Sequence, residues 1–107
     1  LHIKDAKGDW VHAPPIEGTL VVNVADLLAR WTGGAYKSTL HRVVNASGKE
    51  RLSLVLAYDP NPETMIDARE VIGKEAAVCE EPITCGDYLV WRFGRAFSYR
   101  KAEPTTA

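Results

Sequence analysis

Long hydrophobic runs are absent from this 107-residue sequence, although 46% of its residues are hydrophobic. The longest apolar stretches, 20–22 and 52–57, are far shorter than the roughly 20 residues that a membrane-spanning helix needs. Cysteine is also scarce, since Cys79 and Cys85 are the two thiols of the chain, too few for a disulfide framework. We therefore expect a soluble, cytoplasmic protein that does not enter a membrane and whose cysteines are reduced.

Charge of one sign does not accumulate anywhere along the chain. The 13 basic and 14 acidic residues are interspersed and give a formal net charge of -1. No run of like charge is long enough to follow a phosphate backbone, and neither internal repeats nor low-complexity tracts occur. These absences argue against a nucleic-acid partner and predict one small domain.

Short strand-like segments separated by turn residues predict a mostly β fold with antiparallel strands. Residues 1–4 and 10–12 flank a turn rich in Asp and Gly, which predicts a hairpin. The β-branched run 19–24 predicts a strand that is buried on both faces. Residues 39–45 and 51–59 are predicted as two further strands. This spacing is typical of a β-sandwich or jelly roll with helices added at its end.

Two helices are predicted beside these strands. Apolar residues at helical spacing within 26–31, followed by Gly33-Gly34, predict a short helix that stops at the glycines. The capping-box pattern of residues 84–87 predicts a second helix, from about residue 87 to residue 98. Residues 63–81 lack a clear period, so no element is predicted there.

Polar side chains on the two predicted strands 39–45 and 51–59 are candidates for a binding site. Alternation along a strand places His41 on the same face as Val43, and it places Arg51 on the same face as Ser53. A guanidinium fork matches a carboxylate, and a hydroxyl two residues further on can donate another hydrogen bond to the same anion. The pair therefore predicts a carboxylate clamp. On local pattern alone, a hydrogen-bonded structural histidine and a chance Arg-x-Ser remain open as alternatives.

The order and spacing of several motifs resemble those of the isopenicillin N synthase-like oxygenases. The motifs are GTLVVNVAD at 18–26, WTGGAYKSTLHRV at 31–43, RLS at 51–53, DPN at 59–61 and ITCGDYL at 83–89. The resemblance implies a double-stranded β-helix, a form of jelly roll, whose iron is held by a His-x-Asp motif and a later His. His41 matches the later His, while Arg51 and Ser53 match the pair that binds the distal carboxylate of 2-oxoglutarate.

The same resemblance implies an oxidoreductase, an iron(II)- and 2-oxoglutarate-dependent dioxygenase that acts on a small organic molecule and consumes dioxygen. It also allows ascorbate as an auxiliary cofactor. In the implied fold, a short helix follows the second or third strand and a further helix lies at the C-terminus. The strands of His41 and Arg51 would lie in facing sheets, with both side chains directed into one cavity. No catalytic acid or base is assigned to this chain.

The main departure from the family pattern is that no His-x-Asp or His-x-Glu occurs, since neither His2 nor His12 is followed two residues later by an acid. In the family that motif lies shortly upstream of the strand that matches residues 1–4. We therefore expect residues 1–107 to be the C-terminal part of a dioxygenase domain whose N-terminal part is absent, and to be inactive alone. The alternative is a non-catalytic jelly-roll module whose His41 is structural and whose cavity binds a small acid or a protein. No oligomeric state is predicted.

Overall fold

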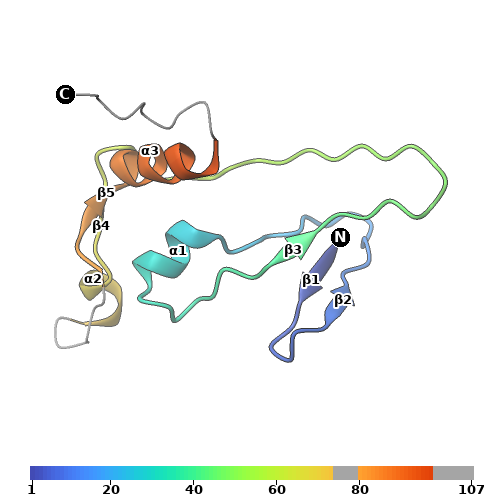
Figure 1. The fold of residues 1–107 in the computed structure, drawn as a ribbon, viewed down its shortest axis with the longest axis horizontal. Helices are drawn as coiled ribbons and strands as arrows, with labels where there is room; N and C mark the ends of the chain where they lie inside the picture. Colours follow the sequence, from blue (N-terminus) through green and yellow to red (C-terminus); the bar gives the residue numbers. More distant parts are fainter. Residues whose placement is uncertain (74–79, 98–107) are drawn as a thin grey trace, which may run out of the picture.

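The structure, a computed structural model, describes residues 1–73 and 80–97. These residues form two small antiparallel sheets and three helices, with α1 between the sheets in the view of Figure 1. Along the chain the elements are β1 (His2–Lys4), β2 (Trp10–His12), α1 (Asp26–Trp31), β3 (His41–Arg42), β4 (Met65–Ile66), α2 (Arg69–Ile72), β5 (Ile83–Thr84) and α3 (Cys85–Ala96). None of the described helices is long and apolar enough to cross a membrane.

The predicted hairpin is confirmed, because β1 and β2 pair in antiparallel fashion. Its turn is held by the carboxylate of Asp5, whose Oδ1 accepts hydrogen bonds of 2.9 Å from the backbone N–H groups of Lys7 and Asp9. Gly8 adopts a φ of 91°, a conformation that costs glycine little. The third strand, β3, pairs with the other edge of β1, so the sheet order is β2-β1-β3.

Both predicted helices are also confirmed. Helix α1 spans Asp26–Trp31 and ends before Gly33 and Gly34, which have φ values of 59° and 86°. Helix α3 begins at Cys85, slightly earlier than predicted, because the hydroxyl of Thr84 accepts the backbone N–H of Asp87 at 3.2 Å. It ends at Ala96, while residue 98 lies outside the described residues.

Three strand predictions are wrong in whole or in part. Residues 19–24 and 51–59 are extended but form no strand, and the predicted strand 39–45 is reduced to the two residues of β3. In Figure 1 the chain after β3 forms a long extended loop that pairs with no described strand and returns toward α3. An extended segment becomes a strand only when a neighbour accepts its backbone hydrogen bonds, and the described residues provide no neighbour here.

The absence of pairing leaves apolar side chains in solvent. Leu20, Leu52 and Leu54 are 92%, 99% and 102% exposed, which contradicts the prediction that the run 19–24 is buried. The Cα radius of gyration is 17.5 Å, whereas a compact 100-residue domain has about 13 Å. The described part of the chain therefore does not enclose a jelly-roll core by itself.

A small core forms beside two short strands that were not predicted. Strands β4 and β5 pair with Ile66 opposite Ile83, and the buried apolar residues beside them are Ile66, Ala68, Cys85 and Tyr88. Cys85 is a free thiol, whereas Cys79 lies outside the described residues. The core thus joins the end of α1 to α2 and α3, at a distance from the three-stranded sheet (Figure 1).

Candidate functional site

His41 lies on the apolar face of the three-stranded sheet. Strand β3 pairs with β1 so that His41 is opposite Ile3, and Ile3 is opposite Val11 of β2. Cross-strand partners project to the same face of a sheet, so these three side chains lie together. All three are solvent-exposed in the structure. The sheet therefore presents an imidazole on a hydrophobic surface that no described segment covers.

The orientation of the His41 ring leaves one nitrogen available. Its Nδ1 lies 3.1 Å from the backbone oxygen of Thr39, and because a carbonyl oxygen can only accept, this contact requires the proton on Nδ1. In the neutral imidazole Nε2 then carries the lone pair. A histidine that donates Nδ1–H to a backbone carbonyl and offers Nε2 has the arrangement common among metal ligands.

Arg51 and Ser53 are adjacent, as the alternation predicted. The Nη1 of Arg51 donates a hydrogen bond of 3.2 Å to the Oγ of Ser53, and both side chains are exposed. Because Oγ accepts from the guanidinium, the hydroxyl proton remains available for an anion. The remaining N–H groups of the guanidinium fork are available to the same anion. The pair is chemically suited to a carboxylate, and its role as a clamp stays a prediction.

The described residues do not assemble a complete metal centre. No group of three or more His, Cys, Asp or Glu side chains suited to a metal ion is found within residues 1–73 and 80–97. His41 supplies one imidazole, which is too few ligands for an iron site. The donor set present in this part of the chain therefore does not fit iron(II) by itself, and the metal assignment of His41 stays a prediction.

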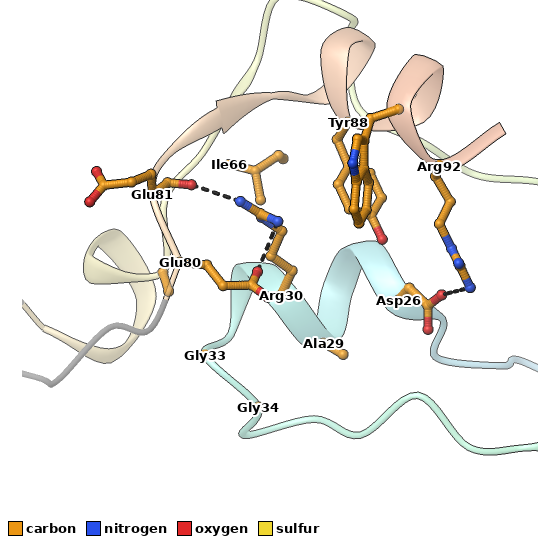
Figure 2. A pocket seen from close by; sticks show the side chains of 12 residues that line it. Asp26, Ala29, Arg30, Gly33, Gly34, Ile66, Glu80, Glu81, Tyr88 and Arg92 are labelled. Carbon is orange, nitrogen blue, oxygen red and sulfur yellow. Dashed lines mark hydrogen bonds and ion pairs between the residues drawn. The ribbon is translucent and has the colours of Figure 1, made fainter. Parts of the chain in front are cut away.

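A cavity of about 500 Å³ lies elsewhere, between α1 and α3 (Figure 2). Arg30 lines the cavity and makes a 2.9 Å ion pair with Glu80. It also donates a hydrogen bond of 2.8 Å to the backbone oxygen of Glu81, and its Cζ lies over the Tyr88 ring, 5.6 Å from the ring centroid. None of His41, Arg51 or Ser53 lines it. No local sequence pattern predicts this cluster, since Arg30 and Glu81 are 51 residues apart.

Four of the five charged residues that line this cavity form two ion pairs, Arg30 with Glu80 and Arg92 with Asp26. Arg92 of α3 forms a 2.6 Å ion pair with Asp26 of α1, and both residues line the cavity (Figure 2). A hydrogen bond from Ser38 and the nearby Arg92 guanidinium lower the pKa of Asp26, although partial burial opposes them. Burial raises the pKa of Tyr88, so its phenol is neutral at pH 7. The cluster ties α1 to α3 and has no activated nucleophile or base.

Comparison with known proteins confirms the family resemblance. Residues 1–60 match the profile of the 2OG-Fe(II) oxygenase superfamily. A homoarginine-6-hydroxylase of Oryza sativa subsp. japonica is 37% identical over 94 residues, which are 84% of this chain and 28% of that protein. Feruloyl CoA ortho-hydroxylase 1 of Arabidopsis thaliana is 33% identical over 103 residues, 94% of this chain and 28% of that protein. The chain belongs to the 2OG-Fe(II) oxygenase superfamily.

The shared segment is short relative to these proteins. A probable iron/ascorbate oxidoreductase of Dictyostelium discoideum is 54% identical over 57 residues, 52% of this chain and 16% of that protein. The chain thus spans between 16% and 28% of the length of these three relatives. No solved structure matches it.

Proposed function

We propose that this chain is the C-terminal part of an iron(II)- and 2-oxoglutarate-dependent dioxygenase that oxidises a small organic molecule with dioxygen. The observation that carries the proposal is the position of His41, on the apolar sheet face, inside the segment that matches the superfamily profile. That segment also contains Arg51 and Ser53. The names of two relatives, hydroxylases of homoarginine and of feruloyl CoA, support a small-molecule substrate.

Different residues of this chain would bind the metal and the cosubstrate. His41 would contribute Nε2 as one ligand, and the other protein ligands would come from outside the described residues. Iron(II) bound by two imidazoles and a carboxylate keeps open positions for a keto acid and dioxygen, which is the chemistry it supplies. Arg51 and Ser53 would hold the distal carboxylate of 2-oxoglutarate and so orient its keto end toward the metal.

The fold that we propose for the whole domain is a double-stranded β-helix. Its support is the apolar surface that the described residues leave open, on the sheet beside Ile3 and on the extended segments 19–24 and 51–58. Strands contributed from outside the described residues would pair with these segments and bury their leucines. Burial of one leucine side chain stabilises a protein by about 1.5–3 kcal/mol. The closed sandwich would then bring His41 and Arg51 to one cavity.

The test is the variant His41→Ala in the intact protein, with iron content and melting temperature measured together. We expect iron to fall from one equivalent to almost none while the melting temperature of the metal-free protein barely changes. Arg42→Gln is the matched control, because Arg42 is the next residue of β3 and projects to the opposite face. It should keep its iron.

A structural histidine would give the opposite result. Its removal would lower stability by about 1–3 kcal/mol through unpaired partners and leave the iron content intact. Full iron occupancy in His41→Ala would exclude the ligand assignment and favour the non-catalytic binding module.

A further inference from the structure

The face of the three-stranded sheet opposite His41 carries a second pair of imidazoles. His2 of β1 and His12 of β2 are direct cross-strand partners, with ring centroids 5.4 Å apart and ring planes at 68°. Arg42 of β3 is the partner of His2 on its other side. The geometry points to a metal site, formed by His2 and His12, for a borderline divalent ion such as Zn²⁺ or Cu²⁺.

The spacing of the two rings suits a single ion. Zn–N bonds of about 2.0–2.1 Å in tetrahedral geometry place two nitrogen ligands roughly 3.3 Å apart. Direct cross-strand partners have Cβ atoms about 4.5–5.5 Å apart, so two imidazoles can reach that separation by rotating about their side-chain bonds. Water would complete the coordination, because His2 and His12 provide two of the ligands.

The state of His2 also favours coordination over a structural role. Its Nδ1 is buried and has no hydrogen-bond partner in the described part of the chain, whereas structural histidines normally have their ring nitrogens paired.

The two cations on this face are partly withdrawn from the imidazoles. Lys4 Nζ and Arg42 Cζ lie 5.7 Å and 4.2 Å from the ring centroid of Trp10. Trp10 is the cross-strand partner of Lys4, two pairs further along the hairpin than His2 and His12 and therefore on the same face of the sheet. Arg42 is still close enough to disfavour a bound cation, which makes it a useful probe of the site.

The donor type determines which ions would bind. Two neutral imidazoles without a carboxylate favour copper, nickel and zinc over magnesium and calcium, which prefer oxygen ligands. Copper binds such donors more tightly than iron(II) does. An ion held here would bridge β1 to β2, and β1 in turn supports the strand of His41. The site is separate from His41, because the two lie on opposite faces of the sheet.

The experiment uses the intact protein without a histidine tag, with His41→Ala as the background so that His41 cannot contribute. Copper(II) is titrated by calorimetry, and the copper-bound protein is examined by electron paramagnetic resonance. We expect one equivalent of copper, with hyperfine structure from two imidazole nitrogens. Adding His12→Gln should weaken binding by about tenfold or more, whereas adding Arg42→Gln should strengthen it.

Either of two results would overturn the site. One is a copper signal with fewer than two nitrogen ligands in the His41→Ala background. This measurement leaves His2 and His12 unchanged, so it does not depend on the folding of a variant at either position. The other is equal copper affinity with and without His12→Gln, in proteins whose melting temperatures agree. Neither depends on whether the protein is an oxygenase, since no turnover is measured.

Discussion

Arg51→Lys in the intact protein should weaken 2-oxoglutarate binding with little effect on folding. Lysine keeps the positive charge, but it loses the planar fork that can hydrogen-bond a carboxylate while also donating to Ser53, as Arg51 does at 3.2 Å. A hydrogen bond that involves a charged group contributes about 1.5–3 kcal/mol. Losing one should raise the KM for 2-oxoglutarate roughly ten- to a hundred-fold. Because lysine keeps the positive charge and a long flexible side chain, the melting temperature of the variant should change little.

The assay is succinate release at saturating substrate and iron, with 2-oxoglutarate varied. Arg69→Lys is the matched control, since it makes the same chemical change at an exposed arginine that serves a local 2.8 Å ion pair with Asp67. We expect its KM for 2-oxoglutarate to equal that of the unsubstituted protein. The reasoning fails if Arg51→Lys also keeps that KM, because the guanidinium would then have no part in binding the cosubstrate.

Three further outcomes follow from the structure. Thr84→Ala should lower stability by about 1 kcal/mol, seen as a lower melting temperature, because it removes the N-cap of α3. Asp26→Asn should lower the melting temperature at neutral pH by a margin worth about 0.2–1 kcal/mol, given the exposure of its pair with Arg92. A Ser38 hydrogen bond and Arg92 depress the pKa of Asp26 below 3.8. The stabilisation by Asp26 is therefore present above pH 3.8 and is lost as the pH falls through the lower pKa of the folded state. Equal melting temperatures of the variant and the unsubstituted protein at all pH values would contradict this. The 107-residue chain alone should neither bind iron(II) tightly nor release succinate, which anaerobic calorimetry and a succinate assay would check.

The features that the sequence predicted correctly have local causes. The hairpin depends on Asp5 and Gly8 within its own turn, and α3 depends on the capping hydroxyl of Thr84 three residues before Asp87. Such contacts form between near neighbours in any context, so a pattern of a few residues is enough to recognise them.

The features that the sequence did not predict depend on distant partners. Residues 51–59 have the alternation of a strand, yet pairing requires a neighbouring strand that the described residues do not provide. The Arg30 cluster joins residues 51 positions apart, a relation that no local pattern records. His41, Arg51 and Ser53 were identifiable as candidates through motif spacing. Their meeting in one cavity is a tertiary property and stays a prediction.

The strand β3 is two residues long, and its two side chains project to opposite faces of one sheet. A slip of β3 by a single position along β1 would therefore exchange them, turning Arg42 toward Ile3 and His41 toward the outer face. An insertion or deletion of one residue in the connection 32–40 could shift the register of β3 and so disrupt the site, although every candidate ligand would still be present in the sequence. For engineering, the length of this connection is a stricter constraint than its composition, and variable-length libraries should be kept out of it.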